Sequence, residues 1–458
     1  MLNFTILIAL FFVYLSPVFL YLYFINKKSN IKKEIDLFSP PFVITFFKII
    51  SIPYLFQLSF DKSYMDPQVL YSPWINDIDL AIVKFMFIEI IAIVFLILGY
   101  YSSFGVKISN MIPLIIKNHY KVNLQITIIV SLIIGLILYF YFIFSIGGLN
   151  YLWENMHQRV IITQGTGYLS SLYQTFLSLY LVSLIYYWKD NFSKPKYIII
   201  LINLIIIAII FSSTGRRGLT ISLLLLTIFS YHYLVKRIRR IPIIKTIIIG
   251  VFLTVFIAAI PLFRTEGSFE YYQHDIEAFK NDVIENIGSI PSRLSNLDRH
   301  IVTFSYFSVD KLWLGKSYVD LFYAPIPRKI YQDKPPVDEG VYFKTIVDGR
   351  EVSPSLPAEQ LSLTSWPPGT IGIMYANFWI PGIIIGMFLT GVIYRSVYNY
   401  MIKSNYSIFS IMIYFYIMYG FGLSNHEIVN TLIKFVFLII ISTLFFKVRF
   451  TKDSYLAT

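Results

Sequence analysis

Residues 196–235 read KYIIILINLIIIAIIFSSTGRRGLTISLLLLTIFSYHYLV, two apolar runs joined by a short polar turn. Each run is close to the roughly 17–25 apolar residues that a helix needs to cross a bilayer. Within hydrocarbon the backbone must satisfy its own hydrogen bonds, and these runs are too long for the strands of a membrane barrel. The stretch therefore predicts two membrane helices, at 196–212 and 217–235, connected by the turn Ser212–Gly218.

The composition extends this interpretation to the whole chain. Of 458 residues, 56% are hydrophobic and 14% are charged, and the mean hydropathy is +0.66. We expect an all-α polytopic membrane protein of about 11 transmembrane helices with one long external loop. The first apolar run starts at Leu2 without a basic region before it or a cleavage site after it, so we expect a retained helix. The spans are expected at 2–25, 38–58, 76–100, 122–145, 166–187, 196–212, 217–235, 243–262, 368–399, 406–423 and 428–447.

Lysine and arginine gather in every second predicted loop. This alternation follows the positive-inside rule, and it accounts for the net charge of +12 without a nucleic-acid partner. It places the N-terminus outside the membrane and the C-terminus inside, and it makes the polar stretch 263–365 external. The chain then divides into about eight N-terminal helices (1–262), the extracytoplasmic loop (263–365) and about three C-terminal helices (366–458).

Several classes of site lack support in the sequence. The chain has no cysteine, which excludes disulfides, thiolate metal sites and a cysteine nucleophile. It also has no P-loop, no convincing G-x-G-x-x-G, and no H-E-x-x-H, G-x-S-x-G or paired Asp-x-Asp motif. We therefore expect neither a metal nor a cofactor.

Some cations at predicted outer helix ends or in outer loops run against the positive-inside rule. Cations placed there usually have a partner, and a lipid phosphate or pyrophosphate at the interface is the natural one. If Ser213 or Thr214 caps the next helix, the first backbone N–H groups of that helix would also face the anion. The alternative is that the arginines only reach toward lipid headgroups. The candidates are Arg159, Arg216, Arg217, Arg264 and Arg328.

Lys334 is a further candidate for binding pyrophosphate. Prolines 325, 327, 335 and 336 favour a stiff path that would hold Lys334 and Arg328 in set positions, although a basic proline-rich linker is the alternative. His426, with the adjacent Glu427, and Glu266 are candidates for a general base, and capping of a helix end is the alternative for His426.

Two features fall inside predicted spans. The charged residues Lys48, Lys84 and Glu89 are costly inside a membrane, so they should face protein or water. Pro381, in Trp379-Ile380-Pro381-Gly382, should break the helix predicted at 368–399.

The order of these motifs resembles the Wzy-type O-antigen and capsule polymerases of bacteria, over most of the chain. The carriers are Thr214-Gly215-Arg216-Arg217-Gly218, Gly315-Lys316-Ser317-Tyr318, Ile326-Pro327-Arg328, Lys334-Pro335, and Pro367-Pro368-Gly369 leading to Tyr375-Ala376-Asn377-Phe378.

The resemblance implies a GT-C-type, metal-independent glycosyltransferase of the bacterial cytoplasmic membrane. Its substrate would be an oligosaccharide linked to undecaprenyl pyrophosphate, and its partners would include membrane lipid, a chain-length regulator and a flippase. The product would be O-antigen of lipopolysaccharide or capsular polysaccharide. The family often has arginine where this chain has His426.

Three other functions are compatible with parts of the sequence. An O-antigen ligase shares the architecture and the lipid donor but uses another acceptor. A flippase or other transporter should carry charges through a membrane-deep cavity, whereas here they gather in the external stretch. A receptor with an external domain would need a larger loop.

Overall fold

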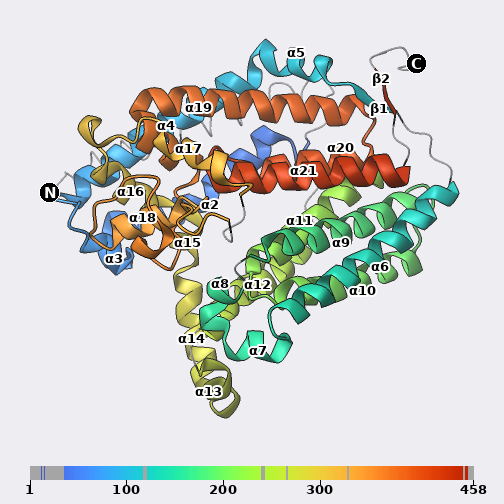
Figure 1. The fold of residues 1–458 in the computed structure, drawn as a ribbon, viewed down its shortest axis with the longest axis horizontal. Coiled ribbons are helices and arrows are strands. Elements are labelled where there is room, and N and C mark those ends of the chain that lie inside the picture. The colour runs from blue at the N-terminus through green and yellow to red at the C-terminus, as the bar shows by residue number, and fades with distance from the viewer. Residues whose placement is uncertain are drawn as a thin grey trace. The chain divides into compact units, whose positions relative to one another are not determined.

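The computed structural model describes residues 12, 15, 36–116, 121–163, 165–238, 243–264, 267–326, 330–446 and 449–451 (Figure 1). Five described helices are long and apolar enough to cross a membrane, at Ile78–Tyr101, Leu124–Ser145, Gly167–Trp188, Lys194–Ser212 and Gly369–Lys403, and Gly250–Phe263 and Ile408–Gly420 are shorter apolar helices. The chain is thus a helical, multi-pass membrane protein. A total of about eleven spans stays a prediction, and the first predicted span lies almost entirely outside the described residues.

Contacts divide the chain into two compact units. Unit 1 combines Met1–Ser109, Pro291–Tyr398 and Gly420–Asn430, and unit 2 combines Asn110–Ile290, Asn399–Tyr419 and Thr431–Thr458. The polar stretch 263–365 is therefore shared between the units. Its described part is also largely helical rather than irregular, with six short α-helices, α13 to α18.

The helices of unit 1 begin near the N-terminus and resume after residue 290. Their bounds are α2 (Pro40–Phe60), η1 (Lys62–Tyr64), α3 (Pro67–Leu70), α4 (Ile78–Tyr101), α5 (Ser103–Met111), α15 (Ile290–Ser295), α16 (Leu297–Tyr306), η4 (Val309–Lys311), α17 (Lys316–Tyr323), α18 (Gly340–Val347) and η5 (Ala358–Gln360). Most of α19 (Gly369–Lys403) and the start of α21 (Asn425–Phe446) also belong to this unit.

Helices α4 and α19 approach each other so closely that their glycines have no room for a side chain. A Cβ atom at Gly99 would lie 2.0 Å from the carbonyl oxygen of Phe388, and one at Gly391 would lie 2.1 Å from that of Leu96. Small residues allow such backbone contact between membrane helices, where van der Waals packing stabilises the pair.

Helix α19 is broken at Trp379, which has φ 56° and ψ −144°, and this confirms the break predicted from Pro381. Pro381 has no N–H to offer the carbonyl of Asn377 four residues earlier. That carbonyl instead accepts from the backbone N–H of Leu314 at 3.0 Å, and the carbonyl of Ala376 accepts from Trp313 at 2.9 Å. The chain before α17 therefore replaces hydrogen bonds that α19 loses at its break.

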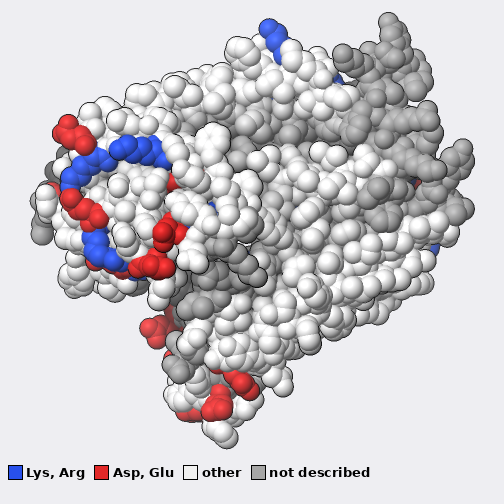
Figure 2. Space-filling view, in the orientation of Figure 1, with Lys and Arg blue, Asp and Glu red and all other residues white. Residues whose placement is uncertain are grey.

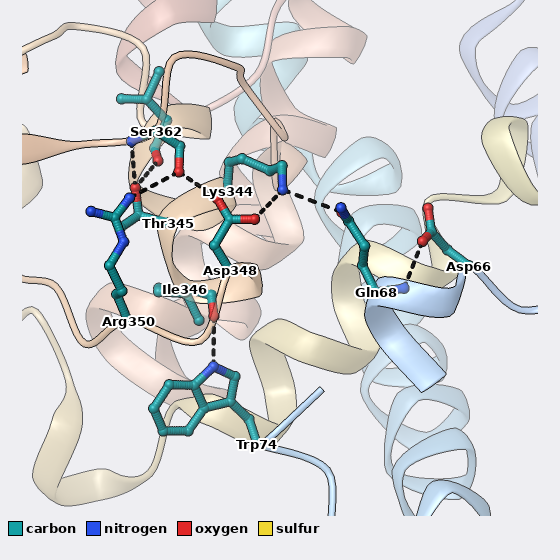
Figure 3. Close-up of polar contacts among 10 residues, drawn as sticks. Asp66, Gln68, Trp74, Lys344, Thr345, Ile346, Asp348, Arg350 and Ser362 are labelled. Carbon is teal, nitrogen blue, oxygen red and sulfur yellow. Dashed lines mark hydrogen bonds and ion pairs between the residues drawn. The ribbon is translucent and has the colours of Figure 1, made fainter. Parts of the chain in front are cut away.

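A polar network binds α3 and Trp74 to α18 in unit 1 (Figure 3). Lys344 forms an ion pair with Asp348 and donates to Gln68 of α3 at 3.2 Å. Trp74 donates from its indole nitrogen to the carbonyl of Ile346 at 2.6 Å. These bonds hold α3 and the segment after it against α18.

Unit 2 consists mainly of long apolar helices. Its elements are β1 (Leu114–Ile116), α6 (Lys121–Ser145), α7 (Leu149–Glu154), η2 (Met156–Gln158), α8 (Arg159–Ile162), α9 (Gly167–Trp188), α10 (Lys194–Ser212), α11 (Arg217–Leu234), α12 (Ile243–Ala259), η3 (Ile260–Arg264), α13 (Ser268–His274), α14 (Ile276–Gly288), α20 (Ile408–Gly420) and β2 (Arg449–Thr451). Helix α6 packs along α9, α10 packs against α11, and α14 packs on α12. The short strands β1 and β2 pair antiparallel.

Charged side chains are unevenly distributed on the face shown in Figure 2. They gather over the short helices of unit 1 and over α13 and α14 of unit 2, and the described surface of the long helices shows few of them. An apolar surface over long helices is what contact with lipid requires.

Candidate functional site

The turn between α10 and α11, residues Ser212–Gly218, is the arginine turn. Helix α11 begins at Arg217, and Arg216 at the N-cap position makes no side-chain cap. Ser213 and Thr214 do not cap α11 either, because their hydroxyls donate back to the carbonyls of Ile210 and Phe211 at 2.7 and 3.2 Å. The hydroxyl cap considered from the sequence is therefore not formed, and Arg216 provides no side-chain cap in its place in the described part of the chain.

Arg159, at the start of α8, reaches the arginine turn from another part of unit 2. Its Nη1 donates to the carbonyl of Gly215 at 3.1 Å. Gly215 has φ +65°, and a Cβ atom there would lie 2.7 Å from the sulfur of Met156. Glycine suits the left-handed backbone at this position, and a larger residue would also displace the end of the Met156 side chain.

Arg217 and the segment ending at Arg264 join the same end of unit 2. Nη1 of Arg217 donates to the carbonyl of Ile257 in α12 at 2.8 Å. The helix η3 continues α12 as far as Arg264, and η2, which directly precedes Arg159, packs against η3. The structure thus brings Arg159, Arg216 and Arg217 together, and the backbone of Arg264 lies in a segment that packs beside them.

The three described guanidinium groups of this cluster differ in setting. Arg159 and Arg217 are partly buried and held by backbone carbonyls, whereas Arg216 is exposed. Guanidinium groups bind phosphate oxygens through two parallel N–H bonds. An exposed arginine beside an uncapped helix N-terminus forms a site that attracts anions.

The start of α21, in unit 1, contains a carboxyl group that the sequence did not indicate. Glu339 is 1% exposed, and its carboxyl oxygens accept from the backbone N–H groups of Asn425 at 2.7 Å and His426 at 3.4 Å. Burial raises the pKa of Glu339 to about 8, although these N–H bonds act in the opposite direction. Glu339 therefore caps α21 across 86 residues of sequence.

Two of the three predicted general bases, His426 and Glu427, lie beside this cap. His426 is exposed, and its Nε2 accepts from the side-chain amide of Asn430 at 2.8 Å. Glu427 accepts from the hydroxyl of Ser424 at 2.7 Å. Asn425 is fully buried and donates to the carbonyl of Ser317 at 2.6 Å, while its Oδ1 has no hydrogen-bond partner among the described residues.

Lys334 is buried at 8% exposure, and its ammonium group donates to the carbonyls of Ala324 and Ile326 at 2.8 Å each. These carbonyls follow the end of α17, so Lys334 closes that end of the helix. The charge of Lys334 is therefore directed toward the protein backbone. Binding of pyrophosphate by Lys334 stays a prediction.

Both ionisable residues predicted inside the membrane helix α4 contact α16. Glu89 Oε1 lies 3.0 Å from Nδ1 of His300, and Nε2 of His300 lies 2.9 Å from the carbonyl of Pro368. Lys84 donates to the carbonyl of Phe304. The prediction that Lys84 and Glu89 face protein or water is confirmed, because α16 supplies protein partners for both.

Sequence reasoning did not identify the roles of His300 and Glu339. The sequence shows that residues 296–300 are polar and that Glu89 would be costly in a membrane. It does not show that His300 and Glu89 form a pair, because they lie 211 residues apart in the chain. For Glu339, no local signal distinguishes it from exposed acidic residues nearby.

The remaining predicted positions lie wholly or partly outside the described residues. Glu266 and Arg328 are outside them, and Arg264 and Lys48 are described only in their backbones. Among the residues that the structure describes, no group of three or more potential ligands could hold a metal ion. Comparison of the chain with models of protein families, with curated proteins and with solved structures finds no match.

Proposed function

We propose that the chain is a membrane glycosyltransferase that joins oligosaccharide repeat units carried on undecaprenyl pyrophosphate. The polymer would be an O-antigen or a capsular polysaccharide, made at the external face of the bacterial cytoplasmic membrane. The observation that carries this proposal is the gathering of Arg159, Arg216 and Arg217 at the uncapped start of α11.

The chemistry of glycan transfer explains why such a cluster is useful. When the acceptor hydroxyl displaces the donor at the anomeric carbon, the bond to pyrophosphate breaks and negative charge develops on the leaving group. Fixed cations and N–H dipoles aimed at that position stabilise the transition state. Arg216 would contact the pyrophosphate, and Arg159 and Arg217 would contribute positive potential while holding the turn in place.

The acceptor hydroxyl must also lose a proton. The sequence indicates three candidate bases, His426, Glu427 and Glu266, and each carries a group able to accept a proton. No metal or nucleotide cofactor is part of the proposed reaction. A chain-length regulator and a flippase are proposed as protein partners.

The topology that this function needs has the N-terminus outside and the stretch 263–365 external, with the C-terminus inside. The alternation of basic loops supports it. Alkaline phosphatase fused near Lys311 should be active, and a fusion near Arg239 should be inactive. The opposite pattern would reverse the topology and overturn an external site.

Two alternative functions are less well supported. An O-antigen ligase would use the same donor. An acceptor assay distinguishes the two enzymes, because a ligase transfers the glycan to another carrier and does not lengthen the chain of repeat units. A transporter needs charged groups along a membrane-deep path, whereas Lys84 and Glu89 are bound to α16.

The direct test compares variants of one exposed arginine in a strain that makes the polysaccharide. Arg216→Ala should lower polymerisation by about 100-fold to 1000-fold, by analogy with the loss of one charge-stabilising donor. Arg216→Lys should retain part of the activity, because lysine keeps the charge but not the paired N–H bonds.

Arg237→Ala is the matched control, because Arg237 follows the other end of α11 and donates to the hydroxyl of Tyr406. It should leave the glycan ladder unchanged at equal protein level. If Arg216→Ala also gives a full ladder, the arginine turn binds lipid headgroups only and the proposed function loses its support.

A further inference from the structure

Helix α17 has its polar residues inside and its apolar residues outside. Ser317 and Asp320 are each 1% exposed, whereas Val319 is 47% exposed and Phe322 is 82% exposed. A surface helix in water shows the opposite arrangement, since its apolar side faces the core. The outer face of α17 therefore matches an apolar environment.

The inward polar face is fully engaged, so the orientation of α17 is fixed. Asp320 accepts from the hydroxyl of Ser355 at 2.7 Å and from that of Tyr342 at 3.5 Å. The hydroxyl of Ser317 accepts from the side-chain amide of Asn377 at 2.9 Å. A rotation of α17 that buried Phe322 would break these bonds and bring Asp320 into contact with solvent.

The exposed apolar face of α17 continues onto α19. Tyr318 stacks on Phe378 with ring centroids 6.4 Å apart and planes 8° from parallel. Phe378 and Trp379 are 40% and 36% exposed, and Leu314, just before α17, is 71% exposed. We call Leu314, Val319, Phe322, Phe378 and Trp379 the α17 surface.

The α17 surface borders a helix that is itself long and apolar enough to cross a membrane. Beyond the break in α19, Ile385 and Leu389 are 61% and 47% exposed. An apolar face that continues from a membrane helix onto a short helix beside it is arranged for one continuous apolar medium. Lys316, exposed at the start of α17, is suited to a phosphate group at the edge of that medium.

We propose that the α17 surface is inserted into the interfacial layer of the bilayer, where lipid covers Val319 and Phe322. The exposed apolar face continues along α19 beyond the break at Trp379. This continuity favours lipid over a second copy of the chain as the partner of the α17 surface. This inference concerns the seating of unit 1 in the membrane and does not depend on the proposed glycan chemistry.

The absence of cysteine from the chain allows a direct test with the full-length protein in vesicles. Single cysteines at Phe322 and Val319 would carry an environment-sensitive fluorophore. Leu363→Cys is the matched control, because Leu363 is an apolar residue of unit 1 that is 76% exposed and lies outside the α17 surface. Quenching is measured with lipids brominated near the headgroup end of the acyl chain and with aqueous iodide.

The labels at 322 and 319 should be quenched several-fold more strongly by the brominated lipid than the label at 363, and more weakly by iodide. Equal quenching by iodide at all three positions would overturn the proposal. Protection of position 322 from both quenchers, together with disulfide cross-linking of Phe322→Cys between copies, would assign the surface to a second copy of the chain instead.

Discussion

Removal of the His300 imidazole should destabilise unit 1 more than a substitution of Ser305, a half-buried residue on the same helix. His300 is 4% exposed and Glu89 is 2% exposed, and the two are joined at 3.0 Å. Because the carbonyl of Pro368 can only accept, Nε2 of His300 carries a proton, and Nδ1 shares a second proton with Glu89. Breaking a buried pair of this kind by removing one partner costs about 3–5 kcal/mol.

His300→Ala should therefore lower the unfolding temperature of the detergent-solubilised protein by roughly 6–20 °C, at about 2–4 °C per kcal/mol. Size-exclusion chromatography after heating measures the folded fraction. Ser305→Ala, on the same helix but only half-buried, should change stability by less than about 0.5 kcal/mol.

A double-mutant cycle isolates the pair from the loss of packing. Glu89→Gln replaces the carboxyl group, so the cost of His300→Ala should be smaller in that background, with a coupling energy of about 1–3 kcal/mol. Additive effects, within about 0.5 kcal/mol, would refute the reasoning, because they would mean that Glu89 and His300 contribute independently.

Three further predictions follow from the candidate sites. Gly215→Ala should destabilise the protein by about 1–2 kcal/mol in the same heating assay, because residue 215 has a left-handed backbone conformation. Gly218→Ala is the control and should be neutral or stabilising, because a Cβ atom at 218 would meet nothing within 4 Å. Equal effects of the two substitutions would contradict the role of Gly215. The pKa of Glu339, raised from 4.5 to about 8, means that the folded protein holds a proton that the unfolded chain has released, so stability should fall as pH rises from about 5 to 8. Glu339→Gln should flatten that slope and the exposed control Glu359→Gln should keep it, and an unchanged slope in Glu339→Gln would exclude this carboxyl as its source. Purified protein with lipid-linked repeat units should polymerise them in EDTA without nucleotide sugar, and loss of activity that Mg²⁺ restores would require a metal site.

Much of the helical architecture could be predicted from the lengths of the apolar runs. Helices are described at the predicted positions from 38–58 onward, because the bilayer demands a minimum apolar length and a helical backbone. The break in α19 was also predictable, since Pro381 removes a specific hydrogen-bond donor. These are local consequences of sequence.

The partners of individual polar residues were not predictable in the same way. Glu339 caps α21, and Glu89 meets His300, only because the fold brings distant segments together. The inward direction of the polar face of α17 has a similar cause, since the bond to Ser355 directs Asp320 inward. In the arginine turn, the sequence pattern did not indicate that the hydroxyls of Ser213 and Thr214 bond to α10 rather than to α11.

The junction between Trp313–Leu314 and the broken part of α19 has a consequence for how freely this protein can change its sequence. Its two hydrogen bonds run from backbone N–H to backbone carbonyl, at 2.9 and 3.0 Å, and so they specify no side chain. Only proline at 313 or 314 would remove a donor, and the φ of +50° at Leu314 favours glycine or asparagine over leucine. Leu314, which is 71% exposed, can therefore change while the geometry of the junction persists, whereas packing constrains the buried side chains of Trp313, Ala376 and Asn377.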